Sequence, residues 1–143
     1  MAATHFSGPV LSVNGFAPGA SSVKDVTGAT TLTTADNGKI ISLNAAAGAA
    51  ITLPAVTNTG FTCKFVVSTL FATSDWVISS AAGDDIEGCF NIASTLTTVD
   101  AADSFTFELG AENVGDWVEV VSDGTSWLVY GVGLGALSLS STG

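Results

Sequence analysis

The sequence predicts an all-β protein, a single sandwich- or barrel-like domain of about seven to nine short strands with extended N- and C-terminal arms. Three observations lead to this prediction. Apolar and polar residues alternate with a period of two through much of the chain. Turn-forming Gly, Asn and Asp residues separate these stretches. Only 11% of the 143 residues are charged, which does not suit helices with charged outer faces.

Seven segments show the alternation and are the predicted strands. They are residues 39–43, 50–53, 61–67, 76–79, 104–109, 117–121 and 126–130. The one segment of helical composition, residues 45–50, is interrupted by Gly48. It is also much shorter than the roughly 12 residues that make an isolated helix persuasive. A loop between two strands is therefore predicted there.

Residues 116–130 predict a β-hairpin whose turn is Ser122-Asp123-Gly124-Thr125, because the glycine allows the positive φ that such a turn requires. Both strands of this hairpin are apolar on both faces. One face is predicted to present Val118, Val120, Trp127 and Val129, and the other Trp117, Val121, Leu128 and Tyr130. A monomeric sandwich needs only one apolar face per strand. The second face is therefore predicted to be covered by a neighbouring subunit or by the chain's own C-terminal tail.

All 3 Lys and 13 acidic residues lie between Lys24 and Asp123, so residues 1–23 and 124–143 are uncharged. The predicted parts are an extended N-terminal arm (1–26), a β domain (27–132) and an uncharged C-terminal tail (133–143). Apolar segments without charge are typical of interface centres, whereas solvated tails are usually charged. Flexible Gly/Ser/Ala tails remain the alternative. The predicted contact residues of the arm are Phe6, Pro9, Val10, Leu11 and Phe16.

The net charge of −10 argues against binding to nucleic acid or to anionic membranes. No stretch approaches the roughly 18 to 20 apolar residues of a membrane span. The N-terminus lacks the basic and apolar regions of a secretory signal, so synthesis in the cytoplasm is expected.

Catalytic chemistry is poorly provided for in this sequence. The only histidine is His5, in the uncharged residues 1–23, and arginine is absent. No nucleophile elbow, phosphate-binding loop or zinc-protease motif occurs. We therefore expect no enzyme activity, no catalytic residues and no cofactor.

Three further groups of residues could be read as structural or as functional. The acidic run Asp84, Asp85 and Glu87 is predicted to be a solvated loop and not a metal site, since it lacks the spacing of a calcium loop. Asp100 and Asp103 are predicted to cap a turn. The three tryptophans, Trp76, Trp117 and Trp127, are predicted to lie in the core or a subunit interface instead of forming a sugar-binding platform.

Cys63 shares its strand phase with Phe61 and Phe65, which predicts a buried structural thiol. A disulfide with Cys89 stays open at this point.

Several stretches resemble small virion structural proteins of tailed bacteriophages. They are ATHFSGPV (residues 3–10), TLTTADNGKIISLNAAAGAAITLPA (31–55), GFTCKFVV (60–67) and GDWVEVVSDGTSW (115–127). The resemblance implies a capsid decoration (cement) protein, or a head-fibre or tail-associated subunit, commonly a homotrimer on a shell of major capsid protein. No coiled-coil or collagen-like segment of a fibre is present, which favours the cement role.

The resemblance and the residue patterns together predict a protein on the capsid exterior of a virion. Its expected partners are the major capsid protein and other copies of itself in a homotrimer. The predicted subunit interface consists of Trp117, Val121, Leu128, Tyr130 and Leu134. The alternative from another functional class is a receptor- or carbohydrate-binding adhesin domain of a head fibre or tail.

Overall fold

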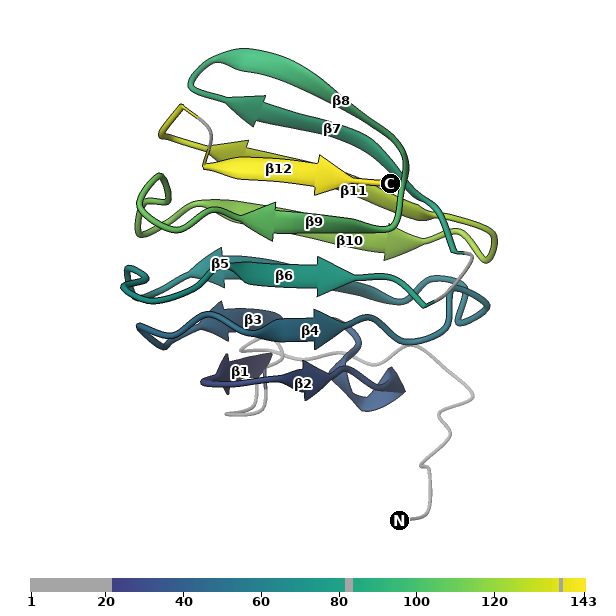
Figure 1. The fold of residues 1–143 in the computed structure, drawn as a ribbon. Coiled ribbons are helices and arrows are strands. Elements are labelled where there is room, and N and C mark those ends of the chain that lie inside the picture. The colour runs from purple at the N-terminus through teal and green to yellow at the C-terminus, as the bar shows by residue number, and fades with distance from the viewer. Residues whose placement is uncertain (1–21, 82–83, 137) are drawn as a thin grey trace, which may run out of the picture.

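The computed structural model describes residues 22–81, 84–136 and 138–143 (Figure 1). Over these residues the chain forms twelve strands and one 3-10 helix, η2 (Thr34–Asp36). The strands are β1 (Val23–Val26), β2 (Thr30–Thr31), β3 (Ile40–Leu43), β4 (Ala50–Thr52), β5 (Thr62–Val67), β6 (Trp76–Ser79), β7 (Ile86–Ile92), β8 (Thr95–Ala102), β9 (Ser104–Phe107), β10 (Trp117–Ser122), β11 (Trp127–Gly133) and β12 (Leu139–Thr142).

The strands build two sheets that face each other as a sandwich. The larger sheet has seven strands in the order β1-β3-β5-β10-β11-β7-β8, and the smaller has five in the order β12-β9-β6-β4-β2. The predicted all-β, sandwich-like fold class is thus confirmed, with more strands than the sequence pattern indicated.

In the first half of the chain, the backbone passes back and forth from one sheet to the other. Strands β1, β3 and β5 pair in parallel in the larger sheet, while β2, β4 and β6 pair in parallel in the smaller sheet. Consecutive strands therefore alternate between sheets, as Figure 1 shows from the lower end upward. The second half adds antiparallel strands to both sheets and one parallel pair, β7 with β11.

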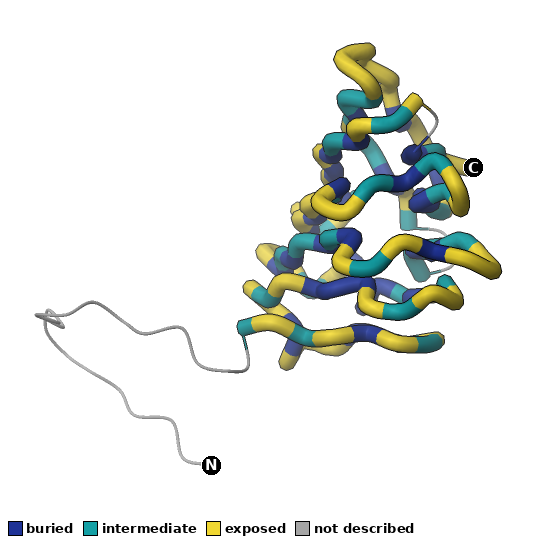
Figure 2. Tube along the Cα trace, turned by 90° about the vertical axis from the view of Figure 1, so that its left-hand side faces the viewer, coloured by how far each residue is buried: buried dark blue, intermediate teal, exposed yellow. Residues whose placement is uncertain are grey.

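The core lies between the sheets (Figure 2). Its largest fully buried side chains are Trp76, Trp127, Phe65, Phe90, Phe105 and Phe107. Phe105 makes edge-to-face contacts with three other phenylalanines, at centroid distances of 5.8 to 6.2 Å. Each fully buried side chain of this size contributes roughly 2 to 3 kcal/mol of transfer free energy, so the aromatic core dominates the stabilisation of the sandwich.

A buried carboxylate, Asp36, links strand β1 to the segment around η2. Asp36, at the end of η2, accepts hydrogen bonds from Lys24 Nζ and Lys39 Nζ, each at 3.0 Å, and from the Thr33 amide. Burial alone would raise the pKa of Asp36, but these hydrogen bonds and the positive charge of Lys24 lower it to about 2. Through Lys24, Asp36 holds the edge strand β1 next to η2.

The structure also corrects several boundaries of the sequence interpretation. All seven predicted strands are present. In addition, β1 lies within the range assigned to the N-terminal arm, and β12 lies within the predicted C-terminal tail, with Leu139 buried. Both segments are strands of the sandwich instead of free arms: β1 pairs with β3, and β12 pairs with β9.

Two acidic segments also differ from their interpretation. Glu87 belongs to strand β7 and not to a solvated loop, because Ile86 beside it is fully buried and begins the strand. Asp100 is part of β8 and not a turn cap. Among the described residues, none of the helices is both long and apolar enough to cross a membrane.

Candidate interaction surface

The outer face of the larger sheet carries the predicted interface residues. The β10–β11 register pairs Trp117 with Val132, Glu119 with Tyr130 and Val121 with Leu128. Side chains two residues apart point to the same side of a strand. Trp117, Val121, Leu128 and Tyr130 therefore share one surface, which we call the apolar face.

The local sequence fixes this register through the turn between β10 and β11. Asp123 Oδ1 accepts hydrogen bonds from the amides of Thr125 and Ser126, at 2.7 and 2.8 Å. The bonds from Ser126 and then Thr125 lower the pKa of Asp123. Gly124 adopts a φ of 99°, a conformation that side chains disfavour. A shift of one residue here would exchange the two faces of both strands.

The apolar face is open to solvent on the single chain. Leu128 is 46% exposed, Tyr130 47% and Val121 36%. A hollow of about 270 Å³ runs between them, lined by Glu119, Val121, Leu128, Val129 and Tyr130. Side chains of this size gain free energy when another surface removes them from water, at about 25 cal/mol per Å² of apolar area.

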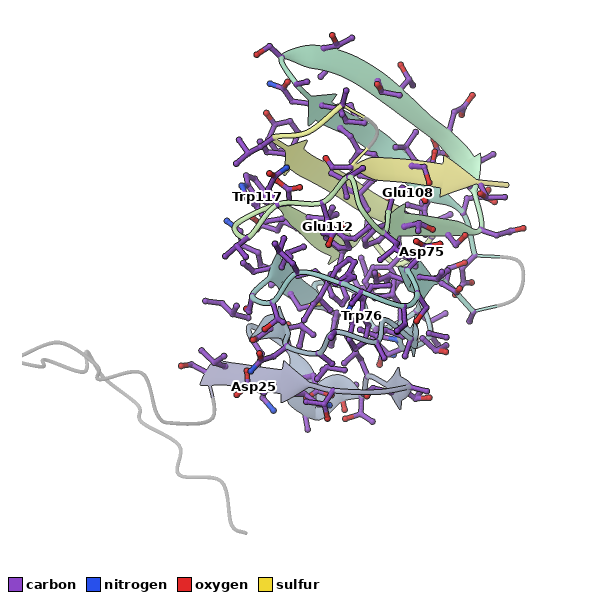
Figure 3. All side chains as sticks on the ribbon, turned by 60° about the vertical axis from the view of Figure 1, so that its left-hand side comes forward. Asp25, Asp75, Trp76, Glu108, Glu112 and Trp117 are labelled. Carbon is purple, nitrogen blue, oxygen red and sulfur yellow. The ribbon has the colours of Figure 1, made fainter. Side chains whose placement is uncertain are left out.

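Trp117 is partly covered by its own neighbours. The Lys64 ammonium lies 3.7 Å from the centroid of the indole ring, and Tyr130 meets the ring edge-on at 5.7 Å. Figure 3 labels Trp117 on the outside of the larger sheet and Trp76 in the interior. Because Lys64 occupies one face of the indole ring, that face is not free for stacking on a sugar ring.

The parallel strands extend the same surface toward β1. The register aligns Val23, Ile40, Lys64, Glu119 and Tyr130 in one row across the sheet. Val23 and Ile40 are 48% and 43% exposed. Lys64 is a contact that sequence reasoning missed, since β5 and β10 lie far apart in the sequence and only their pairing brings Lys64 to Trp117.

The outer face of the smaller sheet has a different chemistry. Its register aligns hydroxyl side chains across all five strands, in the order Thr31, Thr52, Ser79, Ser104 and Thr142. The neighbouring row contains Ala50, Val77, Thr106 and Ser140. We call this surface the hydroxyl face; neither row contains an aromatic or charged residue.

The two cysteines cannot form an intramolecular disulfide in this fold. Cys63 points into the core, and its row runs through Val120 and Val129 to Gly88. Cys89 is therefore about three strand spacings away, roughly 14 Å, and points to the opposite side of the sheet. A disulfide needs Cα atoms within about 7 Å. Burial, with smaller contributions from Asp36 and Glu119, raises the pKa of Cys63 to about 12, as expected for a structural thiol.

Two buried acidic residues outside the apolar face, Glu112 and Asp116, accept hydrogen bonds from backbone amides. Glu112 Oε1 accepts a hydrogen bond from the Phe71 amide at 2.7 Å. Asp116 accepts hydrogen bonds from the amides of Asn113 and Leu134, each at 2.9 Å. These contacts hold the loops at the ends of β9, β10 and β11.

The predicted interface residues are thus brought together only in part. Trp117, Val121, Leu128 and Tyr130 form one surface, whereas Leu134 follows the end of β11 and is 64% exposed in a loop. Trp76 and Trp127 are core residues. The predicted capsid contacts Phe6, Pro9, Val10, Leu11 and Phe16 lie outside the described residues.

In comparisons with known proteins, no family model, no curated protein and no solved structure matches the chain.

Proposed function

We propose that this chain is a structural subunit of a tailed-phage virion, which binds the outside of the capsid as a cement, or decoration, protein. The observation that carries the proposal is the apolar face. Leu128 and Tyr130 are nearly half exposed on a regular sheet, with no other part of the described chain covering them. Surfaces of this kind are usually covered in a functional assembly.

Other copies of the chain are the proposed cover of the apolar face, in a homotrimer. Three copies around an axis can each bury an apolar face while their acidic loops remain in solvent. Glu119 lies within this face, paired with Tyr130 on one side and with Lys64 on the other, so the trimer contact would keep its carboxylate in contact with water or with a hydrogen-bond donor.

The proposed attachment to the major capsid protein uses the uncharged N-terminal segment with Phe6, Pro9, Val10, Leu11 and Phe16. The mechanism is one of linked equilibria: a subunit that binds the assembled shell and not its separate parts stabilises the shell by mass action. An acidic outer surface, from the net charge of −10, would keep particles from adhering to one another.

Binding to particles that lack this protein tests the proposal. Full-length chain should saturate such capsids, while a variant without residues 1–16 should keep its β-sheet circular dichroism and melting temperature but lose occupancy. The truncation removes no residue of the twelve strands, so folding and attachment are read separately. Equal occupancy by both proteins would refute the arm as the anchor, and absence of binding by the full-length chain would refute the cement role.

The adhesin alternative makes the opposite prediction. Glycan binding by the isolated chain, without any affinity for capsids, would replace the cement proposal. The position of Lys64 against Trp117 does not favour that outcome.

A further inference from the structure

The two edges of the larger sheet are protected to different degrees. Edge strand β1 has four residues and carries Lys24 and Asp25, with Lys24 engaged by Asp36. Edge strand β8 has eight residues, of which only Asp100 is charged. Charged side chains and short length are the usual means by which proteins prevent the pairing of sheet edges. The one charge of β8, Asp100, and its bulge at Asp100 and Ala101 both lie near the C-terminal end of the strand, so residues 95–99 have neither protection.

The geometry of the β7–β8 hairpin defines which groups of β8 are unpaired. Its turn is Ala93-Ser94, with φ of 48° and 69°, so Ile92 and Thr95 form the first hydrogen-bonded pair. Hydrogen-bonded pairs then alternate along an antiparallel ladder. The backbone groups of Leu96 and Thr98 therefore point away from β7, toward the open edge. The regular ladder ends at Val99, because Asp100 and Ala101 form a bulge opposite Glu87.

This edge is accessible on the folded chain. Thr95, Leu96, Thr97 and Thr98 are all exposed, with Leu96 at 67%. Figure 1 shows β12, the last strand of the smaller sheet, at the level of β11, so that β7 and β8 extend past it. Figure 2 shows the exposed residues that gather at this end. A further strand can approach β8 without meeting the smaller sheet.

We propose that β8 pairs with β8 of a second copy of this chain, antiparallel and around a two-fold axis at Thr97. This contact goes beyond the proposed function, and it uses a different surface from the apolar face. The joined strands would continue the larger sheet of one copy into that of the other.

The register at Thr97 follows from side-chain parity and charge. In an antiparallel pair, side chains that are directly opposite each other point to the same side of the sheet. The two-fold axis must therefore lie where one residue faces the same residue of the other copy, and not between two consecutive residues. An axis at Thr97 sets Leu96 opposite Thr98 and Thr95 opposite Val99, and it places Asp100 against the turn residue Ser94. An axis at Thr98 would instead set Asp100 against Leu96 and remove a carboxylate from water without a partner.

An axis at Leu96 is disfavoured for a different reason. It would draw Ala93 and Ser94 into the ladder, although both have positive φ and cannot extend a strand. The Thr97 axis alone pairs residues 95–99 of both copies while it keeps the single charged residue at the margin. Two chains of net charge −10 can meet there, because no like charges face each other across the seam.

Engineered disulfides test both the contact and its register. At the proposed axis the two Thr97 residues form a non-hydrogen-bonded pair with Cα atoms about 4.5 Å apart, within disulfide range. The two Thr95 residues would be separated by four residues along the strands, about 14 Å. Thr95→Cys is thus a matched control, with the same residue type, strand, side and exposure class.

The experiment uses full-length Cys89→Ser chain, so that the buried Cys63 is the only other thiol. Under mild oxidation at about 0.15 M salt, which screens the net charge, the Thr97→Cys variant should form covalent dimers. We expect at least about tenfold more than for Thr95→Cys, since only the former pair satisfies disulfide geometry. Equal yields from both variants would indicate random collision and overturn the proposal, as would absence of dimer from Thr97→Cys. Because no capsid is present, the outcome is independent of the cement role.

Discussion

The two outer faces of this sandwich differ in strand length, with four to eight residues per strand in the larger sheet and two to four in the smaller, and they differ in chemistry. The apolar face presents Leu128 and Tyr130, whereas the hydroxyl face presents rows of Ser and Thr across five strands. Hydroxyl groups hydrogen-bond to water and need no partner, while exposed leucine and tyrosine gain free energy when they are covered. The type of uncharged side chain, and not the number of charges, therefore identifies the interaction surface.

The largest expected effect is the loss of stability from a substitution in the core, compared with the same substitution on the apolar face. Trp76→Ala should lower the free energy of unfolding by about 3 to 5 kcal/mol, because it leaves a cavity in the core. Trp117→Ala, on the apolar face, should lower it by only about 1 kcal/mol, because the indole is half-buried and packs on Lys64 and Tyr130. Urea denaturation of both variants measures the difference. Equal losses would mean that the apolar face belongs to the core.

The next effect compares the same substitution on the two faces. Leu128→Asp should weaken self-association by about a hundredfold, because it places a carboxylate in the centre of the proposed interface. Thr52→Asp, on the hydroxyl face, should leave the association constant within about threefold. Sedimentation equilibrium at several concentrations gives both constants. A stronger effect from Thr52→Asp would show that the interface lies on the smaller sheet instead.

A smaller effect concerns the β1 edge, where the Asp36 cluster holds the end of the sheet that carries the apolar face. The pKa of Asp36 is about 2 in the folded chain and 3.8 in its ordinary state. The unfolded chain therefore binds the proton first as the pH falls. The stabilisation by this carboxylate is complete above pH 3.8 and is lost as the pH falls toward 2.

Asp36→Asn should accordingly reduce the free energy of unfolding at neutral pH by up to about 2 kcal/mol. The gap from the wild type should narrow as the pH falls through this range. Denaturation at a series of pH values measures it. A gap that does not change with pH would show that the carboxylate charge contributes nothing to folding.

The smallest expected effect lies on the hydroxyl face. Thr52→Ala and Ser104→Ala remove hydroxyls that face solvent, so each should change the free energy of unfolding by less than about 0.5 kcal/mol. Neither should change the oligomeric state. A loss of association in either variant would show that the hydroxyl face is also an interface.

The sequence was informative wherever apolar and polar residues alternated within one strand. The β10–β11 hairpin and the side of each of its residues follow from the alternation and from Gly124. Strands β7 and β8 were missed because Gly88 interrupts the first and threonines without alternation fill the second. Their pairing depends on the tight turn at Ala93-Ser94, where two non-glycine residues adopt positive φ.

Parallel pairing was beyond the reach of such patterns. Ile40 pairs with Lys64, and Glu119 pairs with the same Lys64 from the other side, although these residues lie far apart in the sequence. The contact between Lys64 and Trp117 and the placement of Ile40 on the apolar face follow from that pairing. No local turn signal specifies it, because parallel strands are joined by long crossovers.

The measurement that tests the central claim most directly is hydroxyl-radical labelling of the protein, compared between the dilute monomer and the assembled particle. The claim is that the apolar face is covered in the assembly and that the hydroxyl face is not. Labelling of Tyr130 and Leu128 should fall by about tenfold or more on the particle, because covered side chains lose contact with the solvent that carries the radical. Labelling of Val77, on the hydroxyl face, should stay the same. Unchanged labelling of Tyr130 and Leu128, with protection of Val77 instead, would contradict the account.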